Sequence, residues 1–319
     1  MNIGEQMQAL YSRFDNIDEV KIELHKELLA INIHNRTAEA TIFLQGAQLS
    51  QYQPHKEPPV IWLSPDCDYK VGSPLRGGIP ICWPWFGALD KNPASVQQQV
   101  PSSEEQAHGF VRVLEWDIDF INAISLDETE LQMSLTLDAN ERWPFACKLV
   151  MKFTIGARLT VCFEVLNNDS KAFVFTSALH SYFAIEDISK TQISGLDSKP
   201  FVDALNDREV FTQHGDITID REIDRIYETN GGDVQVVDNE WQRQISIVSN
   251  SSANAVVWNP WIEKSKRLPQ FSDLSFKQML CVESANVGCD SIVLQPGEWY
   301  TQTVEIMSQA LPLRVDIIQ

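Results

Sequence analysis

The chain has 319 residues, 44% hydrophobic and 22% charged, so its length and composition exclude a mainly disordered state and allow a full packed core. Lys and Arg number 25 against 44 Asp and Glu, and the net charge of −19 argues against a nucleic-acid or anionic-membrane partner. The N-terminus has no basic start, and no stretch reaches the roughly 18 apolar residues of a membrane helix. We therefore expect a soluble, cytoplasmic protein.

The chain has a weak helix candidate near its N-terminus and strand candidates along most of its length. Residues 4–14 show a modest helical periodicity, whereas residues 131–137 alternate apolar and polar side chains as a half-buried strand does. Residues 147–155 and 159–166 flank Gly156-Ala157-Arg158, which predicts an antiparallel hairpin. Further strands are predicted at residues 28–33, 37–44, 60–63, 173–179, 244–248, 255–258, 279–283, 291–294 and 300–307.

Two segments interrupt this run of strands. The polar stretch 90–106 is expected to form a surface loop, and residues 263–277 are a second weak helix candidate. Because strands do not alternate with helices, a doubly wound sheet and a (β/α)8 barrel are excluded. No repeat, low-complexity tract or linker divides the chain. The sequence therefore predicts an all-β protein with few short helices, a large antiparallel sandwich or barrel in a single domain over residues 1–319.

The six cysteines indicate neither a disulfide framework nor a metal site. None belongs to a CxxC pair, and the short paired spacings typical of zinc ligands are missing. A GxGxxG nucleotide fingerprint is missing as well. We predict mostly buried thiols, no metal and no cofactor. The cysteines are Cys67, Cys82, Cys147, Cys162, Cys281 and Cys289.

Residues 75–87, with the sequence LRGGIPICWPWFG, mix a charged side chain with glycine, proline and aromatic residues. The glycines allow close backbone approach and the prolines restrict the chain. Trp83 and Trp85 could form a rigid apolar wall of the kind that holds the apolar face of a sugar. The alternative is a loop that plugs one end of the sandwich.

Three further segments carry candidate chemistry. His108 lies in the sequence AHGFVR, and His180 lies in ALHSYF after an apolar strand. Glu283 lies inside the apolar strand sequence CVESAN, where an unpaired buried carboxylate would be costly. Each has a structural alternative: a satisfied core histidine for His180, and a buried ion pair for Glu283.

Taken in order, the motifs LRGGIPICWPWFG, HGFVR, LHSYF, VVWNPW and CVESANV resemble the hexose-6-phosphate mutarotases, which are glucose-6-phosphate 1-epimerase-like members of the aldose 1-epimerase family. The resemblance extends over about residues 44–306. It implies a β-supersandwich of the galactose mutarotase type, without cofactor. It also implies a monomer that binds a small sugar phosphate as its partner.

The resemblance also implies roles for individual residues. The catalytic pair would be His180 and Glu283, and the phosphate-side arginines would be Arg76 and Arg112. A sugar-contacting aspartate would be Asp224. His108 would line the same pocket. Some relatives carry Gln directly before the HG motif, where this chain has Ala107; Gln106 is an open substitute.

Anomer interconversion opens a hemiacetal and closes it on the other face of the anomeric carbon, which requires one acid and one base. We expect Glu283 to act as base on the anomeric hydroxyl and His180 as acid at the ring oxygen, on opposite sides of the sugar ring. Arginines suit a phosphate group on an acidic protein. The cationic side chains Lys70, Arg76 and Lys91 locally reverse the net charge, and a second cluster does the same. That cluster is Lys264, Lys266 and Arg267, beside Glu263.

The resulting prediction is a cleft that His180 and Glu283 both face, with Arg76 and Arg112 at one side and Trp83 or Trp85 nearby. Three alternatives remain open at this point. One is a mutarotase for unphosphorylated hexoses, and one is a glycoside hydrolase or lyase that uses two carboxylates. The third is a non-catalytic sugar-binding protein of the same fold.

Overall fold

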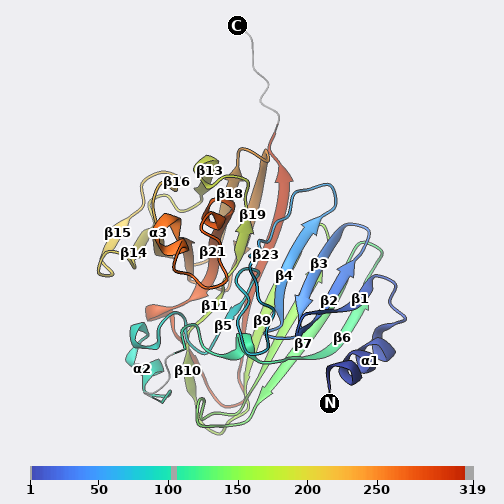
Figure 1. Cartoon of the computed structure of the whole chain (residues 1–319). Helices are drawn as coiled ribbons and strands as arrows, with labels where there is room; N and C mark the ends of the chain where they lie inside the picture. Colours follow the sequence, from blue (N-terminus) through green and yellow to red (C-terminus); the bar gives the residue numbers. More distant parts are fainter. Residues whose placement is uncertain (1, 102–105, 313–319) are drawn as a thin grey trace.

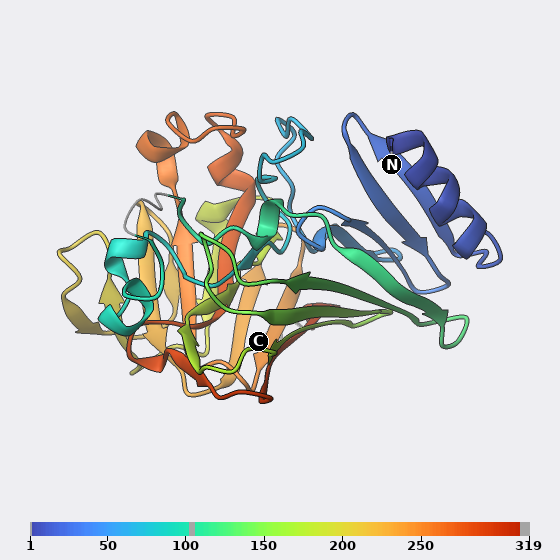
Figure 2. The ribbon, with the colours of Figure 1, turned by 90° about the horizontal axis from the view of Figure 1, so that it is seen from below.

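The computed structural model describes residues 2–101 and 106–312, and within them the strands form four sheets whose pairs are all antiparallel. In Figure 2, helix α1 and the N-terminal strands lie at one end of the molecule, and helix α2 lies toward the other. Of the predicted loop 90–106, residues 102–105 lie outside the described residues. No helix in the described ranges is long and apolar enough to cross a membrane.

The largest sheet, called the β9 sheet below, has the strand order β16-β13-β18-β19-β23-β9-β8-β7-β6 (Figure 1). The predicted hairpin is confirmed, because β8 and β9 pair in register from Ile155–Leu159 outward. The strands of this sheet are β6 (Asp117–Ala123), β7 (Thr129–Leu137), β8 (Cys147–Ile155), β9 (Leu159–Asn167), β13 (Thr191–Ser194), β16 (Ile217–Thr218), β18 (Gly232–Asp238), β19 (Arg243–Ser249) and β23 (Trp299–Ala310).

The second sheet, called the β21 sheet below, has the order β15-β14-β17-β20-β21-β11-β5, and β12 also pairs with β21. Several of its neighbours are far apart in sequence. Its strands are β5 (Ile81–Cys82), β11 (Ser177–Leu179), β12 (Tyr182–Ala184), β14 (Pro200–Asp203), β15 (Val210–Thr212), β17 (Ile223–Glu228), β20 (Asn254–Asn259) and β21 (Met279–Asn286).

Two smaller sheets and a few short helices complete the described structure. The N-terminal sheet has the order β1-β2-β3-β4, and β10 pairs with β22. The remaining strands are β1 (Val20–His25), β2 (Leu28–His34), β3 (Ala38–Phe43), β4 (Gln48–Pro54), β10 (Phe173–Phe175) and β22 (Ile292–Leu294). The α-helices are α1 (Ile3–Phe14), α2 (Ala94–Gln97) and α3 (Trp261–Ser265), and the 3₁₀ helices are η1 (Leu89–Lys91), η2 (Val111–Val113), η3 (Ile188–Lys190), η4 (Ser275–Gln278) and η5 (Gly288–Asp290).

The helix predicted at residues 4–14 is confirmed as α1, which begins with a capping box. The Asn2 side chain accepts a hydrogen bond from the Glu5 amide, and the Glu5 carboxylate accepts one from the Asn2 amide. The helix predicted over 263–277 is instead broken into α3 and η4. Pro269 lies between them and cannot continue a helix.

Two predicted strands differ from the structure. Residues 60–63 form only single bridges, from Ile61 to Phe183 and from Leu63 to Gly77. The strand predicted at residues 173–179 is divided at Thr176, because its two halves pair with different partners: β10 with β22, and β11 with β21 and β5. An apolar run does not reveal such a change of partner.

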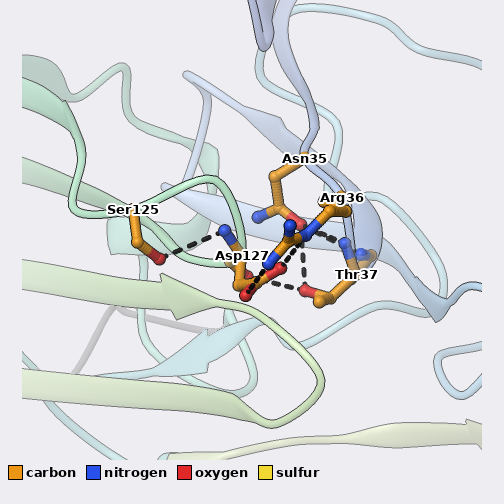
Figure 3. A network of polar contacts seen from close by, with 6 residues as sticks. Asn35, Arg36, Thr37, Ser125 and Asp127 are labelled. Carbon is orange, nitrogen blue, oxygen red and sulfur yellow. Dashed lines mark hydrogen bonds and ion pairs between the residues drawn. The ribbon is translucent and has the colours of Figure 1, made fainter.

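Polar contacts tie the turn after β2 to the turn between β6 and β7 (Figure 3). The Arg36 guanidinium donates to both carboxylate oxygens of Asp127, and Thr37 Oγ1 donates to the Asp127 carbonyl at 2.6 Å. The Asp127 amide donates to Ser125 Oγ at 3.1 Å. The N-terminal sheet is thereby fixed against the β9 sheet, and one continuous core of apolar side chains extends across both and into the β21 sheet.

Candidate active site

A cavity of about 360 Å³ lies over one face of the β21 sheet. Strands β14, β17, β20 and β21 supply lining residues, as do the segments that follow β5 and β11. Asp224, Ile226 and Glu228 all line it, because alternate residues of β17 share one face of the sheet. The cavity brings together five of the six predicted site residues: Arg76, His108, His180, Asp224 and Glu283.

His180 and Glu283 meet in the wall of this cavity. Leu179, the last residue of β11, pairs with Ser284 of β21, so the strand register places the following residue, His180, next to Glu283. His180 Nε2 lies 3.3 Å from Glu283 Oε1, and the two side chains are 10% and 2% exposed. Within the described residues, His180 Nδ1 and Glu283 Oε2 have no hydrogen-bond partner. Buried polar atoms left unpaired in this way are uncommon and are typical of functional sites.

The contact between His180 and Glu283 corrects one expectation from the sequence. A sugar ring cannot lie between two groups 3.3 Å apart, so these two side chains do not lie on opposite sides of such a ring. The arrangement still suits the chemistry, because the anomeric hydroxyl and the ring oxygen are bonded to the same carbon. Neighbouring groups on one side of the sugar can therefore reach both oxygens.

Burial and neighbouring charges shift the pKa values of this pair. Burial raises the pKa of Glu283 well above its usual range, and the Asp224 carboxylate raises it further. Burial also lowers the pKa of His180, and the positive charges of Arg112 and Arg76 act in the same direction. Both shifts favour uncharged groups. The pair therefore keeps one exchangeable proton across the neutral pH range.

His108 enters the cavity from a strained backbone position. Its φ is +62°, and the next residue, Gly109, has φ +64°, where an added Cβ would lie 1.8 Å from the Trp83 carbonyl oxygen. Only glycine fits there. His108 Nδ1 accepts a hydrogen bond from the Gly87 amide at 3.2 Å, so Nδ1 carries no proton. In the neutral ring the proton is therefore on Nε2, which makes His108 a hydrogen-bond donor.

The two predicted phosphate-side arginines lie in different places. Arg76 lines the cavity. Arg112 is not part of the lining: its guanidinium donates to the Ala107 carbonyl at 2.7 Å, and its Nε has no partner in the described ranges. Burial lowers the pKa of Arg112. The positive charge of Arg112 also lowers the pKa values of His108 and His180. Arg112 therefore affects the protonation of the site although it does not line the cavity.

The prediction that Trp83 and Trp85 form an apolar wall for a sugar is wrong. Trp83 and Trp85 are fully buried, and Trp83 packs against Trp143 with ring centroids 5.1 Å apart. Gly87, at the end of their segment, lines the cavity, but both indoles point into the core. The aromatic side chains that do line the cavity are Phe86, Tyr182 and Trp258.

The Asp224 end of the cavity carries two cationic side chains. Lys264 lines the cavity and lies 3.2 Å from Glu222, measured from Nζ to Oε1. Burial raises the pKa of Asp224, and the charge of Lys264 opposes that rise. Arg208, in the turn between β14 and β15, also lines the cavity. No motif in the sequence indicated Arg208, because the turn meets the cavity only through strand pairing.

Lys91 of the first cationic cluster lines the cavity, and the other remaining candidates lie away from the lining. Gln106, the open substitute for the missing glutamine, is not part of the cavity lining, and its side chain accepts a hydrogen bond from Arg142 at 2.9 Å. Lys266 pairs with Glu263 on the exposed side of α3. Within residues 2–101 and 106–312, no group of three or more His, Cys, Asp or Glu side chains could hold a metal ion. The cysteines are all free, and four of the six are buried.

Comparisons with known proteins agree with this fold. The crystal structure of a provisionally named mutarotase, YeaD, from Salmonella typhimurium superimposes with a TM-score of 0.82 at 28% identity, covering 91% of this chain and 94% of that one. A galactose mutarotase-like protein from Clostridium acetobutylicum shares the fold at 13% identity, with a TM-score of 0.73 and coverage of 92% and 98%. The class is therefore the galactose mutarotase-like β-sandwiches.

Sequence comparison defines the family more narrowly. The family model described as aldose 1-epimerase matches residues 30–307. A protein of Salmonella typhimurium with the provisional name glucose-6-phosphate 1-epimerase is 34% identical over 88% of this chain and 87% of its own length. One of Escherichia coli with the same provisional name is 35% identical over 81% and 83%. The chain belongs to the aldose 1-epimerase family and is an epimerase of the mutarotase type.

Proposed function

We propose that the chain interconverts the α and β anomers of hexose 6-phosphates, with glucose 6-phosphate as the preferred substrate. The observation that carries the proposal is the buried contact between His180 and Glu283 in a cavity that also presents Arg76. The provisional names of the relatives from Salmonella and Escherichia coli point to the same substrate.

Ring opening uses His180 and Glu283 together. With the shared proton on His180, the Glu283 carboxylate takes the proton from the anomeric hydroxyl as His180 gives its proton to the ring oxygen. The bond between C1 and the ring oxygen breaks, and C1 becomes an aldehyde. The pair ends with the number of protons it began with, now on Glu283. Positioned acid–base groups contribute about 10²- to 10⁴-fold.

Ring closure reverses these transfers. After rotation about the C1–C2 bond, His180 takes the proton from the C5 hydroxyl and Glu283 returns its proton to the aldehyde oxygen. The hydroxyl then attacks the other face of C1. Because both pKa shifts favour the uncharged pair, the form with the proton on His180 is the less populated and more reactive one. His108, fixed as a donor at Nε2, is suited to holding a sugar oxygen, and Asp224 is suited to accepting from a hydroxyl.

Selection of a phosphorylated sugar is the second part of the proposal. The chain has a net charge of −19, so a dianionic substrate is repelled at long range unless the cavity is locally cationic. Four of the lining side chains are cationic: Arg76, Lys91, Arg208 and Lys264. Arg76 supplies a planar donor fork that matches phosphate oxygens.

The test starts from pure α-glucose 6-phosphate and follows optical rotation with and without the protein, beside the same experiment with α-glucose. We expect acceleration of both relaxations, with kcat/KM larger for the phosphorylated sugar. Equal kcat/KM values would favour an aldose 1-epimerase for unphosphorylated hexoses, which the absence of Arg112 from the lining also supports. No acceleration of either would contradict catalysis.

A further inference from the structure

Tyr182 lies between two groups that the proposed function needs. It is the first residue of β12 and pairs with Cys281 of β21. Its ring is 3% exposed and lines the cavity. Its backbone is fixed at both ends, since its amide donates to the Gly78 carbonyl at 2.9 Å and its carbonyl accepts from the Trp62 amide at 2.9 Å. A buried side chain on so constrained a backbone has little freedom to move.

The ring of Tyr182 holds the imidazole of His180. The two rings stack with centroids 4.8 Å apart and an angle of 8° between their planes. Trp258 meets both edge-on, at 6.2 Å from His180 and 6.1 Å from Tyr182. This stack fixes the plane of the imidazole, and so the direction in which Nε2 faces Glu283. The face of a phenol ring also attracts a cation, which His180 becomes when it holds the shared proton.

The hydroxyl of Tyr182 has a different neighbour. The Arg76 guanidinium interacts with it and lowers the pKa of the phenol, against the rise that burial causes. The Arg76 side chain forms no ion pair within the described part of the chain. Both residues line the cavity, so the hydroxyl, held on a constrained backbone, is placed to orient this guanidinium there.

We infer that Tyr182 is a positioning residue with two separable roles: its ring orients His180 toward Glu283, and its hydroxyl orients Arg76 toward the phosphate of the substrate. This inference rests on the proposed function for the roles of His180 and Arg76. It assigns the ring to the chemical step and the hydroxyl to substrate selection.

Two variants separate the roles. Tyr182→Phe keeps the stack and removes the hydroxyl, so kcat should stay near wild type for both sugars while KM for glucose 6-phosphate rises about 2- to 12-fold, the value of one hydrogen bond. KM for glucose should not change. Tyr182→Leu removes the stack, and kcat should fall for both sugars by about 10²-fold, the usual cost of a misplaced catalytic group.

Tyr227 provides the matched control. It is a fully buried tyrosine of the same sheet whose hydroxyl donates to Gln213 Oε1 at 2.9 Å, and it is not part of the cavity lining. Tyr227→Phe and Tyr227→Leu should lower the melting temperature without changing either kcat or the preference between the two sugars. These two variants show the effect of losing a tyrosine that has only a structural role.

Three results would overturn the inference. One is a folded Tyr182→Leu variant with wild-type kcat. The second is a Tyr182→Phe variant whose KM rises equally for both sugars. If Tyr182→Leu does not fold, Tyr182→Phe still decides, because a fall in its kcat as large as its rise in KM would contradict two separable roles. A wild-type protein inactive on both sugars would instead refute the proposed function.

Discussion

A glutamate in the β9 sheet and a glutamate in the β21 sheet have opposite surroundings. In β9, buried and half-buried residues alternate, and Glu164 lies on the half-buried face with its carboxylate 2.9 Å from Lys152 Nζ. In β21, every residue is buried, and Glu283 leaves Oε2 without a partner among the described residues. The Glu164 carboxylate therefore has a charged partner within the folded protein. Under the proposed function the Glu283 carboxylate is available to the substrate, and this difference is the reason for assigning the chemistry to the β21 sheet.

The largest expected effect is loss of activity when the buried pair is changed. Glu283→Gln and His180→Ala should each lower kcat by about 10²- to 10⁴-fold, because each removes one partner of the proton exchange. Glu283→Gln should leave the free energy of unfolding unchanged or raise it, since it removes a buried carboxyl without a full set of partners. Polarimetry and thermal unfolding measure the two quantities.

Glu164→Gln is the control for that experiment. Its ion pair with Lys152 is partly exposed, so both activity and stability should change little. Near-normal turnover of Glu283→Gln, measured above the spontaneous rate, would remove the basis for assigning the chemistry to the β21 sheet.

A core substitution in the β9 sheet should lower stability and leave activity unchanged, which is the reverse of what we expect for Glu283→Gln. Phe163 is fully buried in β9. Phe163→Ala should lower the free energy of unfolding by about 3–5 kcal/mol through the cavity it creates, while kcat of the folded fraction is retained. Denaturant unfolding and kinetics on the same preparation test this. A loss of kcat without loss of stability would mean that the two sheets are not separable in function.

Arg76→Ala tests whether this arginine selects the phosphorylated sugar over the free sugar. Binding that is equal in ground and transition states appears in KM, so KM for glucose 6-phosphate should rise about 10- to 150-fold and kcat should hold. Glucose should be almost unaffected. Arg158→Ala, which removes an exposed arginine paired with Glu305 in the β9 sheet, is the control. An equal fall of kcat/KM for both sugars would show that Arg76 has a structural role.

The smallest expected effect is a shift in pH dependence. Because the pKa of Glu283 is raised and that of His180 is lowered, the one-proton state extends on both sides of neutrality. We expect constant kcat there, with a fall on the alkaline side. Asp224→Asn removes the charge that raises the Glu283 pKa, so the alkaline fall should begin at lower pH. An acid limb near the ordinary histidine pKa of about 6.5 would contradict this.

The sequence predicted best the features that depend on a single strand, such as its bounds and its buried face. Alternation gave β7, β8 and β9 close to their observed bounds, because each buries one face on the core. The resemblance to the aldose 1-epimerase family implied five side chains that line one cavity, although nothing in their spacing shows that they meet. The order β17-β20-β21-β11-β5 brings them together, and that order joins strands from distant parts of the chain.

The missed and misplaced residues share one physical cause. Whether Trp83 or Trp258 faces the cavity depends on which way each side chain points after pairing, and a change of one residue in register reverses it. Arg208 reaches the cavity from a turn, and Tyr182 was visible in the motif LHSYF without any sign that it stacks on His180. Composition identifies aromatic and cationic candidates, but strand register and the placement of turns decide which of them line the cavity.

The central claim is that the His180–Glu283 pair exchanges protons with a hexose 6-phosphate in the cavity of the β21 sheet. Magnetisation transfer between the α and β anomeric protons of glucose 6-phosphate at equilibrium measures this directly, with wild type and Glu283→Gln at equal concentration. We expect exchange well above the spontaneous rate with wild type and exchange at the spontaneous rate with the variant. Equal exchange with both proteins would contradict the claim.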